Sequence, residues 1–372
     1  MSISELVKIP KPKILSSRND PLHIIRTRKT THNRPATIAG PMVRYSKLPF
    51  RQVCRDYDVD IVYTPMILAR EFVRNNNARL ADFSINEQDS PLIVQVGVNN
   101  VADLLKFVEM VAPYCDGVGI NCGCPIKEQV REGIGCALIY NPELLCAMVS
   151  AVKTKYGDAL RLETKIRIHD DYDQTVDLCR RLSDAGVDWI SIHGRTRTTR
   201  SSQPVNLEAI KYIVEKIKDK NIPVIANGDC FKKCDLREIA EVTKVDGVMA
   251  VRGLLANPAL FAGYETCPWG CVEKFWYYTL EFGGLPYQLL QHHLYCMLEN
   301  MKLEKNLLKE MMDVKNTAAL IDWFETNFIF KRFGEIGFGE GSPYPIDVNR
   351  RFICIPSSNK LCKLGNHLRL FS

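Results

Sequence analysis

The sequence predicts an α/β protein built on a (β/α)₈ TIM barrel and followed by a small C-terminal helical domain. Eight short apolar segments alternate with amphipathic helical patterns over about 230 residues, and this repetition favours a closed barrel over an open sheet. Polar residues stand where the apolar segments end, which is the face on which such barrels build their sites. Three further helical patterns follow the last segment.

Each predicted strand is a short apolar run bounded by Gly, Pro, Asn or Asp. The strands are expected at residues 37–40, 61–66, 91–97, 117–123, 161–168, 189–195, 222–229 and 247–253. Between them, apolar residues recur at three- and four-residue spacing, with Asn or Asp near the start of each pattern. These helices are expected at residues 100–115, 141–157, 173–186 and 206–221, so that the barrel covers about residues 35–265.

The segments that flank the barrel differ from it in composition. Residues 1–34 form a basic N-terminal arm that is expected to be flexible. Residues 266–333 carry the three further helical patterns, which indicate a small bundle packed through aromatic faces. Residues 334–372 are rich in Gly, Pro, Ser and Asn, so a loosely ordered tail is expected there.

Charge is unevenly distributed along the chain. Residues 1–36 carry a formal charge of +6, equal to that of the whole chain, and residues from 331 onward carry +4, so residues 37–330 carry about −4. Basic ends suit a polyanionic partner through phosphate contacts and counterion release. Solvated, disordered ends are an equally good alternative. A mitochondrial presequence fits less well, because Glu5 and several prolines interrupt the amphipathic helix that it requires.

Composition also limits the compartment and the kind of site. The fourteen cysteines are scattered and no secretory signal precedes them, which favours a reducing, cytoplasmic or nuclear, compartment. No run of about 18 apolar residues predicts a transmembrane helix. The pairs Cys230/Cys234 and Cys267/Cys271 do not complete a zinc finger, so no metal is expected.

The segment GVGINCGCP, residues 117–125, is the strongest candidate for a site. It places Asn121, Cys122 and Cys124 directly after a short apolar strand. Because Gly123 allows a tight turn and Pro125 stops further pairing, a thiol at Cys124 would point into a pocket from a stiff base. The alternative is that both cysteines are small buried hydrophobic residues.

Cationic and amide side chains interrupt two other apolar strands. Gln95 stands inside an apolar run, and Lys165 and Arg167 are two residues apart on one strand, so they share its interior face. Two buried cations need an anionic partner.

The seventh and eighth strands end in glycine-containing segments, Asn227-Gly228-Asp229 and Val251-Arg252-Gly253. With a short helix expected at Asn257, they form a phosphate cradle of the kind common in barrels. A phosphate there, together with Lys165 near a ring system, indicates a flavin mononucleotide (FMN).

Seven motifs together resemble the tRNA dihydrouridine synthases, over about residues 37–330. They are GPMVR, PLIVQV, INCGCP, KIRIHDD, ISIHGRT, VIANGD and DGVMAVRGLLANPALF. Such linked motifs are far more specific than any single glycine pattern. The runs YTPMI, NCGCP and RGLLANPA are most similar to the eukaryotic branch that acts on the D-loop uridines 20a and 20b.

The resemblance implies an FMN-dependent enzyme that reduces specific uridines of tRNA to 5,6-dihydrouridine. NADPH, or NADH, would reduce FMN, the flavin would give a hydride to C6 of uracil, and Cys124 would give a proton to C5. Asn121, Arg167 and His193 would hold the uracil after it is swung out of the folded tRNA. The flavin contacts would fall on Pro41, Met42, Val43, Gln95, Lys165, His193, Asn227, Gly228, Asp229, Val251 and Arg252.

The resemblance also makes the helical domain the tRNA-binding domain, and it implies no membrane, metal or obligate protein partner. The candidate phosphate contacts are Lys302, Lys305, Lys309, Lys315, Lys331 and Arg332. Gly40 stands where the family usually has alanine, a small change that should leave the flavin loop intact. Two alternative functions are an FMN-dependent barrel enzyme that reduces a free pyrimidine and a non-catalytic RNA-binding barrel. The second should have lost Cys124 or Lys165, and the sequence has both.

Overall fold

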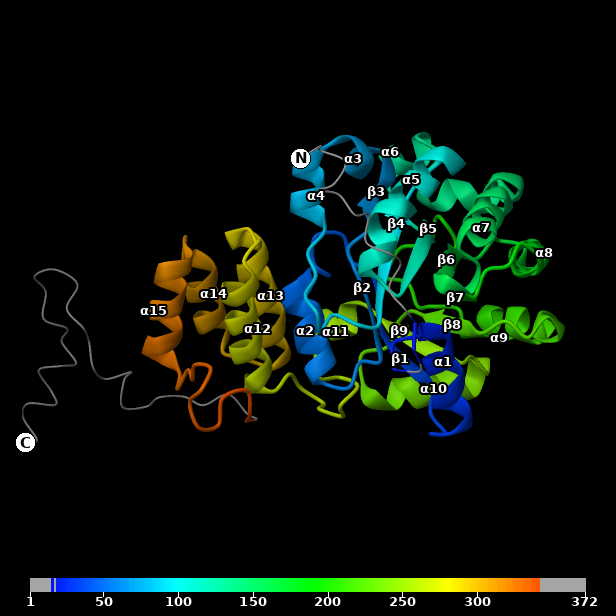
Figure 1. Ribbon diagram of the computed structural model, residues 1–372. Coiled ribbons are helices and arrows are strands. Elements are labelled where there is room, and N and C mark those ends of the chain that lie inside the picture. The colour runs from blue at the N-terminus through cyan, green and yellow to red at the C-terminus, as the bar shows by residue number, and fades with distance from the viewer. Residues whose placement is uncertain (1–14, 17, 342–372) are drawn as a thin grey trace, which may run out of the picture. The chain divides into compact units, whose positions relative to one another are not determined.

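The computed structural model describes residues 15, 16 and 18–341 (Figure 1). Within that part, the chain divides into two compact units. The first unit runs to Leu254 and includes Leu260–Gly263, and the second contains Leu255–Ala259 and the residues from Tyr264 onward.

The first unit contains a closed barrel of eight parallel strands, which confirms the predicted fold class. The ring closes because β1 pairs with both β2 and β9, and β2 also pairs with β4. The eight strands are β1 (Ala36–Ala39), β2 (Ile61–Tyr63), β4 (Leu92–Gly97), β5 (Gly117–Cys122), β6 (Arg161–Arg167), β7 (Trp189–His193), β8 (Val224–Asn227) and β9 (Gly247–Ala250). Most are shorter than predicted, because the polar residues at their carboxyl ends belong to loops.

One strand lies outside this ring. The short strand β3 (Ile67–Leu68) pairs with β4 alone and leads into two short helices, α3 (Ala69–Arg74) and α4 (Asn76–Asp82). The sequence did not predict this insertion, since a two-residue strand has too little alternation to be recognised.

Helices cover the outside of the barrel (Figure 1). They are α2 (Leu48–Asp56), α5 (Val101–Val111), α7 (Pro142–Tyr156), α8 (Tyr172–Asp184), α9 (Leu207–Lys216) and α10 (Lys233–Thr243). Two shorter helices, α6 (Lys127–Arg131) and α11 (Arg252–Ala256), follow β5 and β9 in the loops at the carboxyl ends of these strands. The four predicted helices begin at side-chain caps, where the oxygens of Asn100, Asn141, Asp171 and Asn206 accept hydrogen bonds from backbone N–H groups of the first turn.

The described part of the basic arm contains a helix that packs against the barrel, which the sequence did not predict. Residues Pro21–Thr30 form α1, which is capped by Asp20. Ile24 and Ile25 belong to the same buried cluster as Ile38, Ile61, Tyr63, Ile93, Trp189, Ile225 and Met249 of the barrel interior. Because several of these residues stand at the first positions of their strands, α1 closes the amino-terminal end of the barrel. Residues 1–14 and 17 lie outside the described residues.

Acidic groups of the barrel bind several basic residues around α1. Arg28 and Arg34 each lie 2.7 Å from a carboxylate oxygen of Asp60, which is itself almost fully buried. Lys29 pairs with Asp246 at 2.8 Å. Much of the positive charge in this segment is therefore used within the first unit.

The second unit contains four helices: α12 (Trp269–Phe282), α13 (Tyr287–Asn300), α14 (Lys305–Asp313) and α15 (Thr317–Asn327). Three match the predicted patterns, and α14 was missed because it is short. Glu273 accepts hydrogen bonds from the backbone N–H of Lys331, which precedes the tail, at 2.9 Å, and from that of Gly339, in the described part of the tail, at 2.8 Å. The rest of the tail, residues 342–372, lies outside the described residues.

Among the described residues, no single helix has the length and apolar character needed to cross a membrane, although the bent pair Lys127–Tyr140 and Pro142–Ala159 meets those criteria together.

Candidate active site

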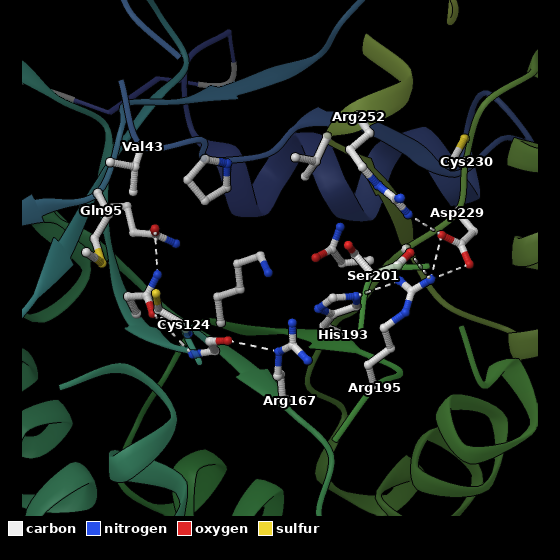
Figure 2. Close-up of a pocket in the computed structure, with 18 of the residues that line it drawn as sticks. Val43, Gln95, Cys124, Arg167, His193, Arg195, Ser201, Asp229, Cys230 and Arg252 are labelled. Atoms are coloured by element: carbon white, nitrogen blue, oxygen red, sulfur yellow. Dashed lines mark hydrogen bonds and ion pairs between the residues drawn. The ribbon is translucent and has the colours of Figure 1, made fainter. Parts of the chain in front are cut away.

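A pocket opens at the carboxyl ends of the strands, on the face where barrels build their sites (Figure 2). Every predicted site residue lines it except Met42, whose backbone N–H donates to the Ser46 hydroxyl instead, at 2.9 Å. Figure 2 shows Gln95 and Cys124 on one side of the pocket, and His193, Asp229 and Arg252 on the other.

Seven lining residues were not among the predicted contacts: Met66, Gly123, Arg195, Ser201, Cys230, Phe231 and Gly253. Six of them stand in or beside the strand-end segments that had been recognised in the sequence. Ser201 belongs to the loop after β7, and no signal in the sequence distinguishes it from its neighbours.

Asn121 fixes the turn that carries Cys124. Its Oδ1 atom accepts hydrogen bonds from the backbone N–H groups of Gly123, at 3.2 Å, and Cys124, at 3.0 Å. Its Nδ2 atom donates to Gln95 Oε1 at 2.9 Å. Asn121 therefore positions the Cys124 turn. Only one of its two amide N–H groups is used by Gln95, and Asn121 lines the pocket, so its substrate contact stays a prediction.

Gln95 presents an unsatisfied donor to the pocket. Its Oε1 atom is occupied by Asn121, but its buried Nε2 atom has no hydrogen-bond partner among the described residues. An unpaired buried donor costs free energy, so this atom is suited to a ligand that supplies an acceptor.

The cysteines of the NCGCP motif have different environments. Cys122 is fully buried, and its Sγ atom faces the Ile120 carbonyl at 3.6 Å. Cys124 is only partly buried and lines the pocket. Burial raises the pKa of the Cys124 thiol, against a smaller opposite effect of Arg167 and Lys165. Cys124 therefore keeps its proton at neutral pH, and Cys122 is a packing residue.

Arg167 braces two loops from the interior face of β6. Its Nε atom donates to the Gly123 carbonyl at 3.0 Å, and Nη1 donates to the carbonyls of Thr196, at 2.7 Å, and Thr199, at 3.2 Å. Lys165, one step deeper on the same face, is buried and makes no hydrogen bond to another described residue. Both cations reach the pocket, as the alternation along the strand predicts.

His193 is neutral and has a defined tautomer. Burial, with the nearby cations Lys165, Arg167, Arg195 and Arg252, lowers its pKa to about 2. Arg195 Nη1 lies 3.0 Å from His193 Nε2, and because arginine can only donate, Nε2 accepts and Nδ1 carries the proton. His193 can therefore donate one hydrogen bond from Nδ1.

Asp229 organises the cationic side of the pocket. Its carboxylate accepts from Arg195 at 2.6 Å, from Arg252 at 2.7 Å and from the backbone N–H of Val205 at 2.8 Å. Burial acts to raise the pKa of Asp229, but these donors outweigh it, and the pKa lies below its usual range. Asp229 is therefore ionised and holds both guanidinium groups in place.

Glycines allow close backbone approach at this side of the pocket. Gly228 has φ of +135°, which disfavours other residues. A Cβ atom on Gly253 would lie 2.1 Å from the Cys230 carbonyl oxygen. The helix expected at Asn257 begins earlier, at Arg252, and the Asn257 side chain instead donates to the Tyr264 carbonyl at 2.8 Å.

The described residues contain no group of three or more His, Cys, Asp or Glu side chains placed to hold a metal ion.

The family model and the relatives that this chain matches all carry the name of one enzyme family. The family model for dihydrouridine synthase (Dus) matches residues 37–349. A tRNA-dihydrouridine(20a/20b) synthase [NAD(P)+] of Saccharomyces cerevisiae is 74% identical over 92% of this chain and 94% of its own length. The protein of the same name in Schizosaccharomyces pombe is 46% identical, over 86% of this chain and 96% of its own.

A human protein, named tRNA-dihydrouridine(20a/20b) synthase [NAD(P)+]-like, is 42% identical over 78% of this chain and 90% of its own length. The region that the family model matches includes the strand-end loops that form the pocket. The chain belongs to the dihydrouridine synthase family.

Proposed function

We propose that this protein is an FMN-dependent oxidoreductase that uses NAD(P)H to reduce uridines 20a and 20b in the D-loop of tRNA to dihydrouridine. The substrate and the reductant follow from the names of its relatives. The observation that carries the chemistry is the partly exposed, protonated thiol of Cys124, held by the Asn121 turn beside an unsatisfied donor and two cations.

The residues present fit FMN. The free Nε2 atom of Gln95 and the Lys165 ammonium suit the polar edge of the flavin ring. On the opposite side, Gly228 allows close approach of the backbone, and Arg252 supplies positive charge for the phosphate. When bound, FMN would supply the hydride for C6 of the uracil.

The chain's own groups would supply the rest of the reaction. Cys124 would hold a proton at Sγ and transfer it to C5. Hydride addition builds negative charge on the uracil carbonyls, which Arg167 and the Nδ1–H of His193 are placed to stabilise. Arg167 would act mainly through charge, because much of its guanidinium is engaged with loop carbonyls.

Two neighbouring cysteines provide a matched pair for the test. Cys124→Ala should retain FMN and tRNA affinity but slow single-turnover reduction of tRNA by about 10²- to 10⁴-fold, the usual cost of losing a general acid. Cys122→Ala should react within a few-fold of wild type. The two variants exchanging these behaviours would refute the assignment.

Two further measurements test the cofactor and the substrate. The purified protein should show a flavin absorption spectrum, or acquire one on incubation with FMN. A folded protein that binds no FMN would refute the cofactor assignment.

Nucleoside mass spectrometry of tRNA from a deletion strain should show loss of dihydrouridine at positions 20a and 20b, whereas a reductase of free pyrimidines would leave those positions modified.

A further inference from the structure

A carboxylate lies inside the barrel beneath the pocket. Glu163 is 0% exposed and stands on β6 two residues before Lys165, so both side chains lie on the interior face of the strand. Its ladder partner on β5 is Gly119, and a Cβ atom there would lie 2.4 Å from Glu163 Oε2. The glycine therefore leaves the space that the carboxylate occupies.

The neutral donors around Glu163 offset its burial only in part. The hydroxyls of Ser191 on β7 and Tyr63 on β2 face the carboxylate and act to lower its pKa, although neither carboxylate oxygen makes a hydrogen bond of regular geometry to a described residue. The Tyr63 hydroxyl on β2 accepts from Trp189 Nε1 at 3.4 Å, which leaves its own hydrogen to face Glu163. A buried carboxylate with so few donors needs a cation.

Lys165 is that cation. Burial raises the pKa of Glu163, and hydrogen bonding by Ser191 followed by the charge of Lys165 opposes that effect. Burial lowers the pKa of Lys165, and the charge of Glu163 is the main opposing effect. The other titratable groups that face Glu163 or Lys165 are Tyr63 on β2, Cys122 and Cys124 on or just after β5, Cys136, Arg167 on β6 and His193 on β7. At neutral pH, Arg167 is the only cation among these, and it disfavours the charged form of Lys165.

We propose that Glu163 is a positioning residue whose carboxylate keeps the Lys165 ammonium charged and in place at the floor of the pocket, and so sets the pH range over which the pocket binds FMN. This inference rests on the proposed function. Glu163 does not line the pocket, so it acts through Lys165.

The test is the dissociation constant of FMN between pH 6 and pH 9.5, followed by quenching of flavin fluorescence. Wild-type affinity should fall as pH rises through the pKa of Lys165. In Glu163→Gln the fall should begin at least about one pH unit lower, because an opposite charge at this range shifts a pKa by about 1–3. At pH 8, Kd should rise about fivefold or more relative to wild type, because Lys165 of the wild type, with a pKa of about 8, is itself half-deprotonated there.

The low-pH limit separates this role from a general loss of structure. Near pH 6, protonation of Glu163 makes wild type resemble Glu163→Gln, so the two Kd values should converge to within about threefold. Adding Lys165→Arg to Glu163→Gln should remove the pH dependence in this range, since arginine stays protonated. Glu143→Gln, which removes an exposed carboxylate on the outer surface, should leave the profile unchanged.

Tyr63→Phe provides a second variant in case Glu163→Gln does not fold. It removes the hydroxyl that faces the carboxylate, so it should shift the profile in the same direction by a smaller amount. An unshifted profile in Glu163→Gln, or in Tyr63→Phe if only that variant folds, would overturn the inference, as would equal weakening at every pH. Failure of the wild-type protein to bind FMN would instead refute the proposed function, and the inference with it.

Discussion

Some polar groups of the pocket hydrogen-bond to other residues of the protein, and others are left available to bind a ligand. The Asn121 amide and most of the Arg167 guanidinium hold the loop of Cys124, and Asp229 holds Arg195 and Arg252. Gln95 Nε2, Lys165 and the Nδ1–H of His193 remain for binding. Substitutions in the first group should therefore alter geometry, whereas those in the second should alter affinity directly.

Replacing Gly40, directly after β1, tests how tightly this part of the backbone packs against its neighbours. A Cβ atom there would lie 2.7 Å from Met249 Cγ and 2.8 Å from Val251 Cγ2. Although the family usually has alanine at this position, Gly40→Ala should lower the free energy of unfolding of this protein by about 1–3 kcal/mol, the usual cost of overpacking. Urea denaturation measures the change.

Gly123→Ala is the matched control for Gly40→Ala. Its Cβ atom would meet its nearest neighbour, the Lys165 carbonyl oxygen, at 3.4 Å, which is ordinary van der Waals contact. Its unfolding free energy should stay within about 1 kcal/mol of wild type. Equal stability of the two variants would show that Met249 moves aside without cost.

For single residues, the sequence predicted which side chains line the pocket, but not which interactions each of them makes. Strand-end position and alternation were sufficient to bring Gln95, Cys124, Lys165 and His193 together. The engagement of Asn121 depends on a loop conformation that no periodicity encodes. The sequence predicted that Lys165 and Arg167 need an anion, but the carboxylate of Glu163, on the same face, was left unassigned because its neighbours Gly119 and Tyr63 come from other strands.

Among the elements, α1 has the clearest structural role. Ile25 is fully buried and joins the cluster inside the barrel, whereas its neighbour Arg26 is exposed. Ile25→Ala should lower the free energy of unfolding by about 2–5 kcal/mol, the range for large-to-small changes in a core. Arg26→Ala, as the control, should change it by less than about 0.5 kcal/mol. A small effect of Ile25→Ala in urea denaturation would mean that α1 is not needed to close the barrel.

The elements that the sequence missed share physical causes. The two-residue strand β3 is too short to show alternation, and α14 has nine residues, about two and a half turns, fewer than the other three helices of the second unit. The arm containing α1 was assigned from its charge, but Arg28, Lys29 and Arg34 pair with Asp60 and Asp246, which come close only when the barrel has formed. Net charge thus indicated a flexible segment where these ion pairs and two buried isoleucines hold a helix against the barrel.

For the whole molecule, the question is how a chain whose residues 37–330 carry about −4 would bind the polyanionic tRNA of the proposed function. The ion pairs around α1 reduce the charge that the described part of the arm can offer to phosphates. In the second unit, Lys302, Lys305 and Lys309 are exposed at or near the start of α14. These lysines are therefore the better candidates for phosphate contacts.

Salt titration of tRNA binding tests these lysines in the full chain. Each phosphate contact adds about 0.9 for a duplex, or 0.7 for a single strand, to the slope of log affinity against log salt. If all three lysines contact phosphates, changing them together to glutamine should reduce that slope by about 2–3 and weaken binding at low salt, with no change in FMN affinity. Changing Lys211, Lys216 and Lys218, on and just after α9 of the barrel, removes the same charge. This control should leave the slope within about 0.5 of wild type, because these lysines are not the proposed phosphate contacts. An effect of net charge alone would instead lower the slope equally in both triple variants. That result would exclude a local phosphate-binding surface on the second unit.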